Sequence, residues 1–461
     1  MRIREDLAMA VTEAHRLASS LTLWPGWDFA ATPLVLHSPE VAYTIGHLSP
    51  PAGYRELDPL AGRSVHAGPR LPDMAANTAR DIAGTRCALV MFPAEPLADI
   101  HEYARLILHE SFHAFQLEGL SGVPLSDYCV MQRYPESDPE NNTACIVENR
   151  ILCAALNALS SPGEAADCMS IAGKFISVRQ ARHARLESED RRDIATYEQR
   201  AEFTEGTPTY VEVVAGKPVA EIISTLEQCN IAGKWAASKR FYATGAAIAL
   251  LLDRLMPIWH KRLAEGGHTL QSLLTEAVGR YVPDVEQVLH ESDYPEILAA
   301  ETARERERKA KIDGMLEELE SGPGVKVDIE VPAGAFTMYD PTNVINIELG
   351  MRLHTTISGF RGANGIVVDI SRLCLENSKS RVLTLRLPVQ PHPEKAADGT
   401  CTFSAEGLSI SAPKGFECLC TGHTYRVRFE IVDYIGFLFS LSRPIIRSRR
   451  LALVASDFAS R

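Results

Sequence analysis

The sequence has little of what marks several large classes of protein. Its 59 acidic residues outnumber its 47 basic ones, and the formal net charge is −12. A nucleic-acid binder needs a basic stripe that neutralises phosphates, and a peripheral membrane protein needs a polybasic patch. No apolar run approaches the ~20 residues that a membrane span requires. We therefore expect no nucleic-acid partner and no membrane partner.

A secretory leader and a disulfide framework are also missing. The first 21 residues carry acidic groups and a helical period instead of a charged region followed by an apolar run. The ten cysteines are scattered over the chain and contain no CxxC pair. This usage is typical of reduced thiols and not of a small disulfide-rich fold. These features predict a cytoplasmic protein.

The chain changes character near residue 321. Helical spacing of apolar residues dominates before it, and alternating β-branched sequence with frequent turns follows it. Residues 295–320 are heavily charged and predict a helix that joins the two parts. We predict an α+β protein: a mostly helical catalytic domain over residues 1–320 with a small N-terminal sheet, and an all-β, sandwich-like domain over residues 321–461. The last strand expected in it is at residues 435–441.

Shorter patterns predict individual elements of the first domain. Residues 33–46 and 86–92 are compact apolar runs that predict strands. Apolar residues spaced three and four apart predict a long helix from about residue 96 to 118. Two separate helices are expected over residues 191–203 and 208–215.

The run HESFH at residues 109–113 is the strongest chemical signal in the chain. Two histidines four apart on a helix project from the same face, and both rings can reach one Zn²⁺ at about 2.0–2.1 Å. Glu110, directly after the first histidine, would lie beside a metal-bound water and take its proton. His109 and His113 are thus predicted zinc ligands, and Glu110 is the predicted general base.

A catalytic zinc site needs a third protein ligand from elsewhere in the chain. The residues after His113 do not continue as His-x-x-Gly-x-x-His, which excludes the metzincin arrangement. The best candidate lies in the segment EFTEGTPTYVE at residues 202–212. Its rival is Glu148, which occupies an otherwise apolar helical face, where a carboxylate must be paired or bind metal.

The segment EGTPTYVE at residues 205–212 resembles the second active-site helix of the gluzincins, the metallopeptidase clan that includes thermolysin and the zinc aminopeptidases. Several of those families carry Glu-Gly-x-small-x-Tyr-x-Glu there, and the first glutamate binds zinc. The resemblance implies Glu205 as the third ligand. Pro208 stands where the family has a small residue. We therefore expect a helix with Thr207 as its N-cap and Pro208 in its first turn, which places Glu205 just outside it.

The same resemblance implies a tyrosine that stabilises the oxyanion of the tetrahedral intermediate. Tyr242, near the start of an apolar helix, is the candidate, and Tyr197 and Tyr210 are alternatives. The strand at residues 86–92 resembles the clan's edge strand, which pairs with an extended peptide substrate. The Gly-x-Met-x-Asn signature of the zinc aminopeptidases is absent from that strand.

These residues predict a zinc metallopeptidase whose substrate is a peptide or a protein. A zinc amidohydrolase that acts on a small metabolite fits the same chemistry, because an activated water can attack either carbonyl. A third interpretation is a non-catalytic zinc-containing interaction protein with the β domain as its binding module. Glu110 favours an enzyme, since a structural zinc site needs no base.

Overall fold

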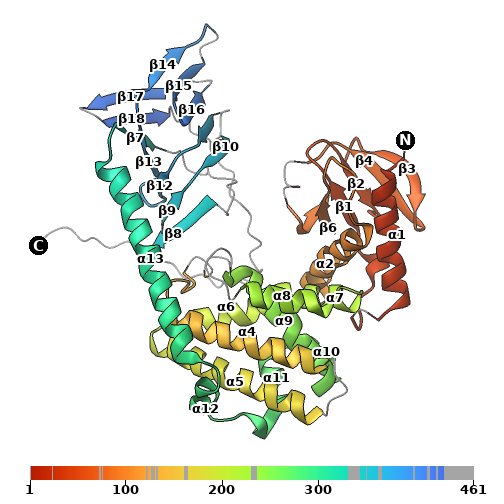
Figure 1. Cartoon of the computed structure of the whole chain (residues 1–461). Coiled ribbons are helices and arrows are strands. Elements are labelled where there is room, and N and C mark those ends of the chain that lie inside the picture. Colours follow the sequence, from red (N-terminus) through yellow and green to blue (C-terminus); the bar gives the residue numbers. More distant parts are fainter. Residues whose placement is uncertain are drawn as a thin grey trace, which may run out of the picture. The chain divides into compact units, whose positions relative to one another are not determined.

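The computed structural model of the 461-residue chain describes residues 2–429. The exceptions within that range are residues 23, 72–73, 75, 121–122, 126–129, 131–132, 160–164, 230–235, 331–342, 349, 362–365, 398–399, 413–415 and 422–423. The strand predicted at residues 435–441 lies outside the described residues. Backbone contacts divide the chain into two compact units, Met1–Glu317 with Val344–Arg352 and Glu318–Asn343 with Leu353–Arg461. The predicted mixture of helices and strands is confirmed (Figure 1).

A six-stranded sheet belongs to the first unit (Figure 1). Its spatial order is β3-β4-β2-β1-β6-β5. The strands are β1 (Leu34–His37), β2 (Ala42–Ile45), β3 (Arg55–Leu60), β4 (Arg63–Gly68), β5 (Thr78–Ile82) and β6 (Thr85–Met91). The strands predicted within residues 33–46 and 86–92 are confirmed as β1, β2 and β6. β1 and β6 pair in parallel and are largely buried, which accounts for their continuous apolar sequence.

β6 is an inner strand, so the expectation that it forms the edge of the sheet is wrong. β1 pairs with it on one side and β5 on the other. β5 and β6 form a hairpin whose turn residues, Ala83 and Gly84, have positive φ of 46° and 78°. Such a turn is usually marked by Asn-Gly or Asp-Gly, so Ala-Gly concealed the hairpin in the sequence. The edge strands are therefore β3 and β5, and β5 lies against α2, the helix that follows β6.

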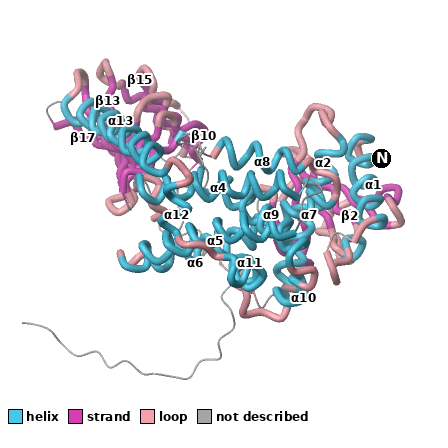
Figure 2. The backbone as a smooth tube through the Cα atoms, turned by 60° about the horizontal axis from the view of Figure 1, so that its bottom comes forward, coloured by secondary structure: helices cyan, strands magenta, loops and turns pink. Residues whose placement is uncertain are grey.

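Helices form most of the rest of the first unit, and α4, α5, α9 and α11 pack side by side within it (Figure 2). The helices are α1 (Glu5–Ser20), α2 (Ile100–Gly119), α4 (Pro139–Leu159), α5 (Ala165–Ser188), α6 (Arg192–Ala201), α7 (Thr207–Val214), α8 (Val219–Gln228), α9 (Ala236–Leu255), α10 (Trp259–Ala264), α11 (Leu270–Val278) and α12 (Val285–His290). Among the described residues, none has both the length and the apolar character that a bilayer crossing needs.

The long helix α2 lies between α1 and the sheet. It begins at Ile100, later than the expected residue 96, because the Asp99 side chain accepts hydrogen bonds from the backbone N–H groups of His101 and Glu102. One face of α2 is buried in the main apolar core of the unit through Tyr103, Ala104, Ile107, Leu108 and Phe112. This packing fixes the direction in which the opposite face points.

The run from α6 to α7 is continuous, so the predicted break after residue 203 is wrong. A π-helical segment, Glu202–Gly206, joins the two helices, and Thr207 keeps helical φ and ψ of −72° and −36°. Pro208 lacks the N–H that a regular α-helix would direct to the carbonyl of residue 204. The hydrogen-bond ladder changes pattern at this point. Glu205 consequently lies inside the helical run and not outside it.

The described strands after α13 (Tyr294–Ser321) form two sheets, ordered β17-β18-β7-β13-β12-β9-β8 and β10-β11-β16-β15-β14. They are β7 (Val325–Glu330), β8 (Val344–Glu348), β9 (Met351–His354), β10 (Ile357–Arg361), β11 (Val367–Ile370), β12 (Cys374–Asn377), β13 (Val382–Leu387), β14 (His392–Lys395), β15 (Cys401–Ala405), β16 (Leu408–Ala412), β17 (Phe416–Thr421) and β18 (Thr424–Phe429). Val327 and Leu385 from one sheet share a fully buried core with Phe403 and Ile410 from the other. This is sandwich packing.

Candidate metal centre

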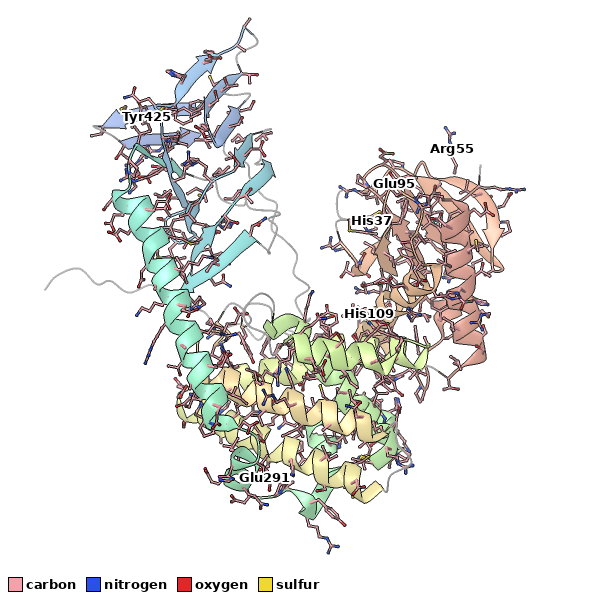
Figure 3. The ribbon with its side chains drawn as sticks, viewed as in Figure 1. His37, Arg55, Glu95, His109, Glu291 and Tyr425 are labelled. Carbon is pink, nitrogen blue, oxygen red and sulfur yellow. The ribbon has the colours of Figure 1, made fainter. Side chains whose placement is uncertain are left out.

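His109 and His113 lie on the face of α2 opposite its buried apolar residues, and His109, labelled in Figure 3, bonds to Glu212 of α7. The centroids of the two imidazole rings lie 4.9 Å apart, and the ring planes meet at 73°. His109 is 5% exposed. Two imidazoles one helical turn apart can approach one ion only when both face the same space, and this pair does.

Glu205 joins the two histidines. One candidate ligand atom from each of His109, His113 and Glu205 lies within 4.8 Å of the other two. The distance between His113 Nε2 and Glu205 Oε2 is 3.6 Å. Two ring nitrogens and one carboxylate oxygen are the protein ligands of a catalytic zinc site with an open fourth position. The structure thus brings together the three residues that the sequence proposed as ligands, and their chemistry fits a zinc ion.

Both histidines are held through the nitrogen that faces away from the shared space. His109 Nδ1 donates to Glu212 Oε1 at 2.6 Å, and His113 Nδ1 donates to Gln116 Oε1 at 2.8 Å. Lys217 Nζ in turn donates to the other Glu212 oxygen at 2.9 Å. Hydrogen bonds of this kind fix the tautomer of a ligand histidine and leave its Nε2 lone pair for the metal.

Gln116 also ties α2 to the π segment. Its Nε2 donates to the Phe203 carbonyl at 3.0 Å and to Thr207 Oγ1 at 2.9 Å. Gln116 is thus hydrogen-bonded to the chain on both sides of Glu205. Sequence reasoning missed Gln116, because an amide is not a metal ligand. Its position three residues after His113, on the same helix face, was the available signal.

Glu148, the rival third ligand, lies in a different group of buried charges. It accepts hydrogen bonds from Arg179, Arg182 and Arg240. Burial acts to raise the pKa of Glu148, but the three guanidinium groups outweigh it and hold that pKa well below its usual range. The expectation that a carboxylate on this apolar face must be paired or bind metal is met by pairing.

Glu110 is 6% exposed and lies beside His109 in the sequence. Burial raises the pKa of Glu110 to about 7, against the opposing charge of His109 and with help from the Glu205 and Glu212 carboxylates. Burial lowers the pKa of His113 to about 4, and His109 adds to that shift. Burial also opposes protonation of His109, yet its bond to Glu212 raises its pKa overall.

These residues, His109, His113, Glu110, Glu205 and Glu212, are called the histidine group below. Three of them are carboxylates, and Lys217 bonds to one of these, Glu212. Glu205 and Glu212 help to raise the pKa of Glu110, so the site carries an excess of negative charge that opposes ionisation of a further buried carboxyl. A divalent cation would neutralise that excess and reverse the rise in the pKa of Glu110. The charge balance therefore fits a metal as well as the donor atoms do.

Tyr242 lies next to the histidine group. Its ring stacks on the His109 ring at a centroid distance of 6.0 Å and an interplanar angle of 12°, and the residue is 37% exposed. The two alternatives are engaged elsewhere. Tyr197 packs edge-on against Phe241 in a buried aromatic cluster, and the Tyr210 hydroxyl donates to Asp253. Of the three tyrosines considered from the sequence, Tyr242 is the one that contacts a candidate ligand.

Comparison of the chain with protein-family models, with curated proteins and with solved structures found no match in any of the three. The interpretation of this site therefore depends on its own residues and geometry.

Proposed function

We propose that this chain is a zinc-dependent hydrolase of the gluzincin type that cleaves peptide bonds. The observation that carries the proposal is the convergence of His109, His113 and Glu205, with Glu110 beside them. A bound zinc ion would supply a Lewis acid that polarises a carbonyl and acidifies water. His109, His113 and Glu205 would hold that ion, and Glu212 and Gln116 would keep the two imidazoles in the required tautomer.

Glu110 would act as general base and then as general acid. Its carboxylate would take a proton from the attacking water and pass it to the leaving amine. A base works best when its pKa is close to the operating pH, and burial raises the pKa of Glu110 to about 7. The Tyr242 hydroxyl would donate a hydrogen bond to the oxyanion that develops on the attacked carbonyl.

A peptide substrate is favoured over a small molecule by the edge strand β5. It lies against α2, which carries the two histidines. An extended peptide can add to such an edge through backbone hydrogen bonds, and this would bring a scissile bond alongside that helix. We include a cytosolic location in the proposal, because the cysteines are scattered over a long chain and lack the dense, regular spacing of a secreted disulfide framework.

The test is zinc analysis of the purified full chain, together with hydrolysis of a mixed peptide library. Wild type should contain one zinc per chain and cleave peptides. Glu110→Gln should keep the zinc and lose about 10²–10⁴-fold in rate, the usual contribution of a positioned base. Glu102→Gln, an exposed glutamate on the same helix, is the matched control and should behave as wild type.

Other outcomes separate the competing functions. Zinc with cleavage of small amides but not of peptides would indicate an amidohydrolase. Zinc with no hydrolysis of either would indicate a non-catalytic site. A wild-type chain that binds no zinc, or a Glu110→Gln variant with full activity, would contradict the proposal.

A further inference from the structure

The helical run from α6 to α7 carries four glutamates at regular spacing. Glu198, Glu202, Glu205 and Glu212 are four, three and seven residues apart. In an uninterrupted α-helix this spacing would place all four on one face. They nevertheless reach two separate groups of buried side chains, because the π segment lies between the second glutamate and the fourth.

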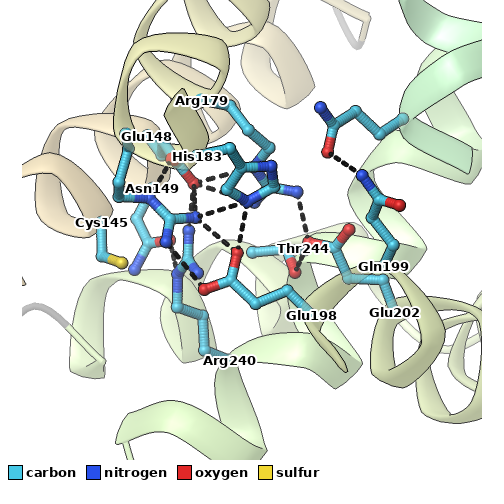
Figure 4. Close-up of polar contacts among 12 residues, drawn as sticks. Cys145, Glu148, Asn149, Arg179, His183, Glu198, Gln199, Glu202, Arg240 and Thr244 are labelled. Carbon is cyan, nitrogen blue, oxygen red and sulfur yellow. Dashed lines mark hydrogen bonds and ion pairs between the residues drawn. The ribbon is translucent and has the colours of Figure 1, made fainter. Parts of the chain in front are cut away.

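The first two glutamates belong to the arginine cluster, a fully buried network of Arg179, Arg182, Arg240, Glu148, Glu198 and Glu202 (Figure 4). Glu198 accepts a hydrogen bond from Arg182 Nη2 at 2.6 Å. Glu202 accepts one from Arg179 Nη1 at 2.6 Å and another from Thr244 Oγ1 at 2.7 Å. Three guanidinium groups and three carboxylates balance the charge of this cluster.

The last two glutamates belong to the histidine group. Glu205 Oε2 lies 3.6 Å from His113 Nε2, and Glu212 bonds to His109 Nδ1. A π turn contains one residue more than an α turn, so it rotates the following helix by about 100° relative to the preceding one. The π segment therefore divides a single acidic face into two sets that point in different directions.

The π segment is fixed on both sides. Glu202, its first residue, is held by Arg179 and Thr244. Gln116 bonds to the carbonyl of Phe203 on the side of α2. Gly206, its last residue, meets Gly245 of α9 so closely that a Cβ on either glycine would overlap the backbone of the other helix.

These contacts are needed to hold the π segment, because neither a π turn nor a buried ion pair is favourable by itself. π turns are rare and form a weaker ladder than the α-helix. Buried ion pairs cost so much desolvation that apolar residues of similar size often stabilise a fold at least as well. A buried charged network can still be useful when it selects one backbone conformation, here the π segment, over the alternatives.

We propose that Glu202, together with Arg179 and Thr244, is a positioning unit for the metal site. It keeps residues 202–206 in the π conformation and so aims Glu205 and Glu212 at the two histidines. The inference rests on the proposed zinc site, but none of these three residues is a candidate ligand. Loss of the unit would weaken metal binding even though all three ligands remain.

Thr244→Val is the primary test, because valine has nearly the shape of threonine and removes only the hydroxyl that holds Glu202. Arg179→Met removes the second contact. Zinc affinity of the full chain is measured by competition with a chromophoric chelator, and Co²⁺ absorption reports the coordination. Each variant should bind zinc about tenfold more weakly, comparable with loss of an outer hydrogen-bond partner of a ligand, and should show altered Co²⁺ bands.

Two variants serve as matched controls. Thr143→Val alters another fully buried threonine, whose hydroxyl donates to a carbonyl of α4. Arg240→Met removes a guanidinium of the same cluster that contacts Glu148 and Asn149 instead of Glu202. Both should keep wild-type zinc affinity and Co²⁺ bands. If Arg179→Met does not fold, Thr244→Val decides the question alone.

Unchanged affinity and spectrum in a folded Thr244→Val variant would overturn the inference while leaving the zinc site intact. Equal losses in the control variants would overturn it as well, because the effect would then be a general loss of stability. A wild-type chain that binds no zinc would instead refute the proposed function, and the positioning role with it.

Discussion

Two groups of buried carboxylates lie along one helical run, and they are neutralised in different ways. In the arginine cluster, Glu148, Glu198 and Glu202 are matched by three arginines, and two of the ion pairs, Arg179–Glu202 and Arg182–Glu198, are 2.6 Å long. In the histidine group, three carboxylates face two imidazoles and one lysine. The first group pairs each of its carboxylates with a guanidinium, and the second has the donor atoms for a metal cation.

The difference shows how burial alone fails to identify a functional acid. Glu148 and Glu205 are both buried or nearly so and both touch other helices. What separates them is the kind of partner, since Glu148 accepts hydrogen bonds from three arginines whereas Glu205 lies beside the His113 imidazole. The following variants test that distinction.

The largest effect is expected from Glu205→Ala. Removing a ligand should reduce zinc affinity by more than the roughly 10–100-fold that loss of an outer partner costs. Chelator competition measures the affinity, and Glu221→Ala, an exposed glutamate of α8, is the control. Wild-type affinity in Glu205→Ala would remove Glu205 from the site.

Arg182→Met should affect folding and not metal binding. Arg182 pairs with Glu148 at 2.7 Å and with Glu198 at 2.6 Å. The substitution removes this buried cation from both carboxylates. Breaking such a pair typically costs about 3–5 kcal/mol. Urea unfolding gives the free energy of unfolding, and zinc titration of the folded variant gives the affinity. A cost below about 1 kcal/mol would mean that the arginine cluster is not structural.

Glu110→Gln should change how stability depends on pH in the metal-free protein. Because burial raises the pKa of Glu110 to about 7 from 4.5, the folded state holds this proton more tightly than the unfolded state. Wild type should therefore lose stability as the pH rises from about 4.5 to 7, and the variant should lack that loss.

The two proteins should differ by about 3 kcal/mol at pH 8 and little at pH 4. His113, whose pKa burial lowers to about 4, acts in the opposite direction but is common to both proteins. Parallel unfolding curves with a chelator present measure the difference. A constant offset at all pH values would show that the pKa of Glu110 is not raised.

Lys217→Met should have the smallest effect on zinc affinity, and it should raise the affinity instead of lowering it. Removing a cation from the histidine group increases its negative excess, so zinc should bind about two- to fivefold more tightly, in the range of a partly exposed ion pair. Lys174→Met, which removes an exposed pair with Glu291, is the control. Weaker zinc binding in Lys217→Met would mean that Lys217 mainly holds Glu212 in place.

Much of this arrangement could be predicted from the sequence, because it depends on local spacing. The heavily charged segment at residues 295–320 predicted α13, and apolar runs predicted β1, β2 and β6. The four-residue spacing of His109 and His113 predicted that they share a face.

What could not be predicted depends on contacts between distant segments or on unusual backbone. Pro208 suggested the start of a helix, because proline is common in the first helical turn. Only the structure shows that a π segment precedes it. Glu148 and Arg179 lie on different helices, so their pairing has no local signal. The edge strand was misassigned, because Ala83 takes a positive φ that few alanines adopt.

The contact between Gly206 and Gly245 has a consequence for tracing the ancestry of this chain. Two helices that touch through their main chains admit no larger residue at that crossing. A distant homologue could exchange almost every surface side chain and still be obliged to keep this pair of glycines. Together with the two histidines, these two glycines should therefore identify a homologue even where the rest of the sequence no longer resembles this chain.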